Sequence, residues 1–159
     1  MKKHILFVCY ANAFRSPVAE ILFKRLVKRL GKKRIVVNSA GISNKYYGLS
    51  GKEALEPSLI EISLKHNIDL RKRKVKSLKK QMVKNASKII VFDNYVGKKL
   101  IKRFPEAEDK IYLVKKLAGV KGNSNIKNLK GKSVKEHENY IKDIKRYLRR
   151  RRFFMTEYR

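Results

Sequence analysis

Cysteine is almost absent from this sequence, since Cys9 is the only one among 159 residues. A single cysteine cannot form an intramolecular disulfide, which fits a reducing cytoplasm, where we expect the protein. The sequence also lacks an apolar run of membrane-spanning length, so we expect no membrane association. Its apolar content of 43% still suffices for a core. We expect one domain over 1–150, followed by a basic tail at 151–159.

Acidic residues are also scarce: 13 Asp and Glu face 42 Lys and Arg, which gives a net charge of +29. The densest basic runs are 71–76 and 149–152. Such a charge can attract nucleic acid non-specifically to the basic surface and can steer anionic substrates. The alternative is that these runs form solvated cationic faces without a partner.

Histidine is rare as well, and its three residues are isolated from one another at positions 4, 66 and 137. No pattern of carboxylates or cysteines has the spacing of metal ligands. We therefore expect neither a metal nor another cofactor.

One short segment carries the chemistry, namely residues 9–17 with the sequence CYANAFRSP. It follows an apolar run at 5–8 and precedes an amphipathic one at 18–30, a pattern that predicts a strand, a tight loop and a helix. Inward-pointing N–H groups of such a loop and the positive end of the helix dipole make a site for an anion. Arg15 can hold that anion with two parallel hydrogen bonds, and the same field favours the thiolate of Cys9 as a nucleophile.

A cysteine, five residues and then Arg-Ser is the loop of cysteine-dependent phosphatases. The alternative is a buried core cysteine without a chemical role, the commoner fate of a lone cysteine. The Arg-Ser-Pro sequence at 15–17, at this spacing after a strand, favours the catalytic interpretation.

The periodicity of the remaining chain predicts an α/β fold. Besides the strand before Cys9, we expect strands at 34–38, 88–92 and 111–114, and helices at 17–30, 57–66, 77–85 (capped by Ser77), 94–103 and 134–148. This alternation indicates a four-stranded parallel sheet with helices on both faces and a phosphate-binding loop after the first strand. The site should lie beyond the carboxyl ends of the strands, where Cys9 stands.

In their order along the chain, several motifs resemble those of the low-molecular-weight protein tyrosine phosphatases over roughly residues 3–150. The motifs are Val8-Cys9 with Asn12, Arg15-Ser16-Pro17, Ser39-Ala40-Gly41, Asn67-Ile68-Asp69-Leu70, Ile90-Val91-Phe92-Asp93 and Phe104-Pro105-Glu106-Ala107. The first is specific, and the order of the others makes the match strong.

The resemblance implies a role for each residue of the loop. Cys9 would attack phosphorus to form a phosphocysteine, and Ser16 would donate a hydrogen bond to the thiolate. Arg15 and the loop amides would hold the equatorial oxygens of the phosphoryl group. Asn12, a residue that tolerates left-handed geometry, would brace the loop with Ser39. The other residues implied to form the phosphate-binding loop are Tyr10, Ala11, Ala13 and Phe14.

Two loop positions depart from the family. Ala11 stands where glycine is usual, and its methyl group narrows the loop or restricts its dihedral angles. Phe14 stands where a second cysteine is usual, so no disulfide can protect the nucleophile. The single cysteine also excludes the intramolecular thiol relay of related arsenate reductases.

The most important departure concerns the general acid. The family carries an Asp-Pro-Tyr-like stretch before its last helix, whereas Asn128 begins the matching Asn-Leu-Lys stretch here. An amide cannot donate a proton as a carboxylic acid does, and no Asp or Glu occurs in 111–134. General acid catalysis is typically worth about 10²–10⁴-fold. Asp93 is a substitute candidate, with capping of the next helix as its alternative role, and Glu136 is expected to belong to a capping box.

The family resemblance also implies an aromatic wall for the substrate ring. Tyr46 or Tyr47 could supply it, or either could simply pack against the protein. We therefore expect a monomeric phosphatase that hydrolyses phosphotyrosine in proteins or small aryl phosphates. We expect the hydrolysis to be slow, because the general acid is missing.

The alternative is a degenerate relative that binds phosphorylated ligands or nucleic acid without useful turnover. The intact residues Cys9, Arg15 and Ser16 favour the enzyme. Asn128 and the net charge favour the alternative.

Overall fold

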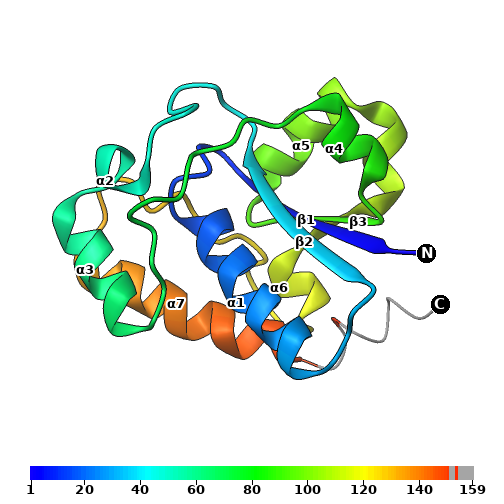
Figure 1. The fold of residues 1–159 in the computed structure, drawn as a ribbon. Helices are drawn as coiled ribbons and strands as arrows, with labels where there is room; N and C mark the ends of the chain where they lie inside the picture. The colour runs from blue at the N-terminus through cyan, green and yellow to red at the C-terminus, as the bar shows by residue number, and fades with distance from the viewer. Residues whose placement is uncertain (151–152, 154–159) are drawn as a thin grey trace.

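A computed structural model describes residues 1–150 and residue 153 (Figure 1). Its four strands form one parallel sheet in the order β2-β1-β3-β4, which confirms the predicted fold class. The strands are β1 (Lys3–Cys9), β2 (Ile35–Gly41), β3 (Lys88–Val91) and β4 (Ile111–Leu113). The helices are α1 (Arg15–Arg29), α2 (Gly51–Ala54), α3 (Pro57–Lys65), α4 (Lys80–Asn85), α5 (Asn94–Arg103), the 3-10 helix η1 (Pro105–Lys110), α6 (Val114–Leu117) and α7 (Val134–Leu148).

The central strand β1 is buried on both faces, and its side chains alternate between two cores. Ile5, Phe7 and Cys9 point into the core shared with α1 and α7. Leu6 and Val8 point into the core shared with α4 and α5. These two helix pairs lie on opposite sides of the sheet (Figure 1). Coverage of both faces explains why the sequence before Cys9 is a continuous apolar run rather than an alternating one.

Several predicted boundaries differ from the structure. The helix after the loop begins at Arg15, two residues before Pro17, and a proline fits there because N–H groups in the first turn lack helical partners. The predicted cap Ser77 is wrong: α4 begins at Lys80 without a side-chain cap. Ser77 instead forms a parallel bridge with Gly41, so its backbone extends the pairing at the end of β2. The helices α2, η1 and α6 were not predicted.

The predicted basic tail, 151–159, lies outside the described residues except for Phe153. That side chain is only 2% exposed and packs with its ring centroid 6.2 Å from that of Phe23 on α1. Phe153 therefore belongs to the core of the domain. No helix in the described part of the chain is both long and apolar enough to cross a membrane.

This packing predicts that Phe153→Ala lowers the free energy of unfolding by about 3 kcal/mol, because the substitution leaves a cavity against Phe23. Urea-induced unfolding measures the change. Tyr47→Ala is the control, since Tyr47 is 60% exposed and its loss should cost little. Equal effects of the two substitutions would contradict the placement of Phe153 in the core.

Candidate active site

The sulfur of Cys9 lies at the carboxyl end of β1, within hydrogen-bonding distance of two groups. Its Sγ is 3.0 Å from Oγ of Ser16 and 3.3 Å from the backbone N of Asn12. Oγ of Ser16 already accepts a hydrogen bond from Nδ2 of Asn12 at 2.8 Å, so its own proton is available to the sulfur. Two hydrogen-bond donors are thus directed at one sulfur.

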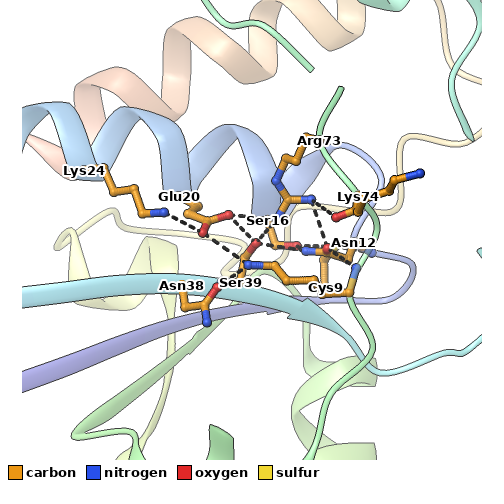
Figure 2. Close-up of polar contacts among 10 residues, drawn as sticks. Cys9, Asn12, Ser16, Glu20, Lys24, Asn38, Ser39, Arg73 and Lys74 are labelled. Atoms are coloured by element: carbon orange, nitrogen blue, oxygen red, sulfur yellow. Dashed lines mark hydrogen bonds and ion pairs between the residues drawn. The ribbon is translucent and has the colours of Figure 1, made fainter. Parts of the chain in front are cut away.

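The loop between Cys9 and α1 turns on the fully buried Asn12, whose φ of 56° is left-handed. Its Nδ2 donates to Ser16 and, at 3.0 Å, to Oγ of Ser39. Its Oδ1 accepts from Nη1 of Arg73 at 3.0 Å and from the backbone N of Lys76 at 2.9 Å (Figure 2). The side-chain amide thus makes the four hydrogen bonds that it can make, which fixes the turn of the loop.

Behind Asn12 lies a cluster of charges around Glu20 of α1, which is only 3% exposed (Figure 2). Its carboxylate pairs with Arg73 at 2.8 Å, Lys24 at 3.0 Å and Lys76 at 3.4 Å, and accepts from Oγ of Ser39 at 2.7 Å. Burial alone raises the pKa of Glu20, but the nearby charges of Arg73 and Lys76 and the hydrogen bonds outweigh it. The pKa is therefore lowered below its usual value.

Sequence reasoning missed this cluster because it treated the basic run 71–76 as uniform. The run is divided: Arg71 is exposed and pairs with exposed Asp69, whereas Arg73 turns inward to Glu20. The available signal was an acidic residue inside the amphipathic pattern of the first helix, since a buried carboxylate requires a cation.

Arg15 is the first residue of α1, and its guanidinium is anchored through one nitrogen. Nη1 donates to Oδ2 of Asp93 at 2.7 Å and to the carbonyl of Ile126 at 2.8 Å. Both of these bonds leave Nε and Nη2 available for an oxyanion. The backbone carbonyl of Arg15 accepts from the hydroxyl of Tyr140 at 2.6 Å, and burial raises the pKa of Tyr140 well above its usual value.

Asp93 thus has both carboxylate oxygens engaged. Oδ1 accepts from the backbone N of Val96 at 2.8 Å and caps α5, while Oδ2 holds Arg15. Both oxygens of Asp93 thus make structural contacts, one with α5 and one with Arg15.

A cavity of about 350 Å³ opens above Cys9 and Arg15. The loop residues Tyr10, Ala11, Ala13 and Phe14 line it together with Lys45, Tyr46, Ala54, Leu55, Glu56, Leu59, Asn128, Leu129, Lys130, Gly131, Lys132 and His137. Of the two candidate rim tyrosines, Tyr46 lines the cavity, whereas Tyr47 is exposed. The structure therefore brings Cys9, Arg15, Tyr46 and Asn128 to one cavity.

Residues 128–132 are placed on the cavity by hydrogen bonds just before them. The backbone N of Ile126 donates to the carbonyl of Phe92 at 2.7 Å, and Oδ1 of Asn125 accepts from the backbone N of Asn94 at 2.8 Å. Asn128 is two residues after Ile126, and its Oδ1 accepts from the backbone N of Lys130 at 3.1 Å.

Among the residues that the structure describes, Glu56 is the single carboxylate that lines the cavity, and sequence reasoning did not identify it. It precedes α3 and lies far from the loop in sequence, so only the folded chain brings it near. His137 is isolated from the other histidines in sequence, yet it is buried beside Phe14 with the ring centroids 4.9 Å apart.

Ala11 fits the loop without a left-handed backbone, since Asn12 is the residue with positive φ there. The position that requires glycine is Gly41 on the neighbouring strand β2, where the loop backbone comes very close. A Cβ added to Gly41 would lie 2.7 Å from the backbone carbon of Ala11. The loop backbone thus rests directly on the end of β2.

Comparison with known proteins gives one consistent result. Residues 4–154 match the family model described as low molecular weight phosphotyrosine protein phosphatase. A probable low molecular weight protein-tyrosine-phosphatase, EpsP of Ralstonia nicotianae, is 31% identical over 112 residues, which cover 70% of each chain.

Two solved structures share the fold. The low molecular weight protein tyrosine phosphatase of T. tengcongensis has a TM-score of 0.81 and 24% identity, over 98% of this chain and 99% of its own. The YwlE arginine phosphatase of Geobacillus stearothermophilus has a TM-score of 0.77 and 24% identity, over 98% of this chain and 94% of its own.

The cluster around Glu20 predicts that Arg73→Ala lowers the free energy of unfolding at neutral pH by about 3 kcal/mol, because the buried carboxylate loses its best-placed partner. The pKa of Glu20 is lowered in the folded protein, so its contribution is complete above the usual value of 4.5 and is lost as the pH falls through the folded value. The difference from the unmodified protein should therefore shrink in acid.

Urea unfolding at a series of pH values measures this effect. Arg71→Ala is the matched control, because it removes a neighbouring arginine whose ion pair with Asp69 is exposed. If both variants lost the same stability at every pH, the buried cluster would not support the loop.

Proposed function

Because the chain belongs to the low molecular weight phosphotyrosine protein phosphatase family, we propose that it hydrolyses phosphotyrosine or aryl phosphate monoesters through a phosphocysteine. The observation that carries this proposal is the position of Cys9. Its sulfur accepts from Asn12 and lies beside Ser16 at the base of a cavity that Arg15 also lines. A nucleophile, its stabilising donors and an oxyanion-binding guanidinium are thus assembled at one place.

In the first step, the thiolate of Cys9 attacks phosphorus. The S–P bond forms while the bond from phosphorus to the phenolic oxygen breaks. Nε and Nη2 of Arg15 hold the equatorial oxygens, and the anchored Nη1 keeps the guanidinium plane in place before the substrate arrives. The phenolic oxygen leaves as an anion, because Asn128 cannot protonate it.

In the second step, water attacks the phosphocysteine. The S–P bond breaks, the thiolate of Cys9 is regenerated and the proton of the water leaves with inorganic phosphate. The hydrogen bonds from Ser16 and Asn12 stabilise the departing thiolate in this step as well. Neither step requires a metal or a cofactor.

Aryl phosphates fit the site better than phosphoarginine, the alternative that the likeness to an arginine phosphatase raises. Arginine is a far poorer leaving group than a phenolate unless it takes up a proton, and no carboxylic acid occupies position 128. The cavity is also lined by Lys45, Lys130 and Lys132, which repel a guanidinium group.

The nucleophile assignment predicts that Cys9→Ser reduces turnover of p-nitrophenyl phosphate by at least about 10³-fold while binding of inorganic phosphate is retained. The loop and Arg15 remain in that variant. Arg15→Lys should weaken phosphate binding as well as turnover, because lysine keeps the charge but not the paired donors. Steady-state kinetics and phosphorus NMR titrations measure the two effects.

Iodoacetate provides the control, because Cys9 is the only thiol that it can alkylate. Inorganic phosphate should protect the unmodified protein from inactivation. Residual activity of a few per cent in a clean Cys9→Ser preparation would contradict the assignment.

The absent general acid predicts that the rate falls steeply as the pKa of the leaving phenol rises. We expect p-nitrophenyl phosphate to be hydrolysed much faster than phenyl phosphate or phosphotyrosine. Asn128→Asp should flatten this dependence and raise the rate on phenyl phosphate by about 10²-fold, since position 128 lines the cavity. This variant, unlike the unmodified protein, should also lose activity at high pH, because the new carboxylic acid ionises there.

A series of substituted phenyl phosphates measures the slope. Asn123→Asp is the matched control, because it adds the same charge to the same loop at a position that does not line the cavity. A flat dependence in the unmodified protein would show that another group donates the proton, with Glu56 and Asp93 the first to test.

A further inference from the structure

The mouth of the cavity above Cys9 is rimmed by three exposed lysines from two loops. Lys45 belongs to the loop after β2, while Lys130 and Lys132 belong to the loop before α7. In the described part of the chain, Glu56 is the single carboxylate among the residues that line the cavity. The rim formed by Lys45, Lys130 and Lys132, called here the lysine rim, therefore carries a local excess of positive charge.

Tyr46 joins the two loops of the lysine rim. Nζ of Lys45 lies 5.4 Å from the centroid of its ring, a cation–π distance. Interaction with the ammonium group of Lys130 lowers the pKa of the Tyr46 phenol. Tyr46 thus lies beside ammonium groups from both loops at the cavity.

The cavity also has an apolar lining. Phe14, Leu55, Leu59 and Leu129 line it together with Ala54. An apolar wall next to a phosphate-binding loop accepts the ring of an aryl phosphate. The lysine rim would then lie near the residues that flank the phosphotyrosine in the substrate.

We propose that the lysine rim selects phosphotyrosine flanked by aspartate or glutamate residues. This inference rests on the proposed function, and it names the substrate class of that same site. Carboxylates beside the phosphotyrosine would pair with Lys45, Lys130 and Lys132, whereas flanking lysine or arginine residues would be repelled. Exposed ion pairs are individually weak and screened by salt, so the preference should be modest and should fall as salt is added.

Binding of phosphotyrosine peptides to the Cys9→Ser protein tests the proposal without depending on turnover. Three peptides share one length and differ in flanks of aspartate, alanine or lysine. At low salt we expect the aspartate peptide to bind about tenfold more tightly than the alanine peptide, and the lysine peptide more weakly than both. Fluorescence anisotropy gives the dissociation constants.

The double variant Lys130→Ala and Lys132→Ala should lower the preference for the aspartate peptide to about twofold. The matched control is Lys98→Ala with Lys102→Ala, which removes the same charge from exposed positions on α5 outside the cavity lining. That control should keep the tenfold preference. Equal losses in the two double variants would assign the preference to net charge and overturn the proposal.

Two further measurements separate the possible outcomes. A short RNA that displaced the aspartate peptide and bound more tightly than it, in a manner dependent on Lys130 and Lys132, would overturn the proposal in favour of a nucleic-acid site. Turnover of p-nitrophenyl phosphate by the unmodified protein reports on the proposed function separately. If that turnover depends on Cys9 while the peptides show no preference, only the inference about the lysine rim fails.

Discussion

The geometry of the whole site depends on one buried side chain, the amide of Asn12. A left-handed backbone is unfavourable for most residues, but here the amide is completely hydrogen-bonded in that conformation. One of its partners is Arg73, which is itself held by the carboxylate of Glu20. The curvature of the loop around Cys9 is therefore tied to a cluster of charges behind it. A fully satisfied buried network of this kind favours a single conformation.

The same network positions the proposed nucleophile and the groups that would bind the phosphoryl oxygens, but it supplies no proton donor for the leaving oxygen. Asn12 directs Ser16 toward the sulfur of Cys9, and the ion pair with Asp93 fixes Arg15 before substrate binds. In the proposed mechanism, these groups prepare nucleophilic attack and hold charge on the phosphoryl oxygens. The leaving oxygen has no equivalent support from position 128, because an amide occupies it. In the proposed mechanism, the site therefore depends on substrates whose leaving group is stable as an anion.

Local sequence patterns predicted the parallel sheet and the segment of the loop, because both depend on contacts close in the chain. The apolar run before Cys9 and the Arg-Ser spacing are examples. The pair of Glu20 and Arg73 was not predictable in this way, since its members are 53 residues apart. Glu56 and the lysine rim were missed for the same physical reason, because only the folded chain brings these distant segments to the cavity. Serine is a residue type that often caps helices, but the backbone of Ser77 pairs with Gly41 instead.

In the proposed mechanism, Cys9 becomes covalently phosphorylated during turnover. The amide at position 128 cannot take a proton from the attacking water, so the second step should be slow as well and the intermediate should accumulate. Rapid acid quenching during hydrolysis of p-nitrophenyl phosphate, followed by peptide mass spectrometry, measures it directly. We expect a phosphoryl group on the peptide that contains Cys9, together with a burst of p-nitrophenolate of matching size. Turnover without a burst and without a phosphorylated cysteine, or a phosphoryl group on another residue, would contradict it.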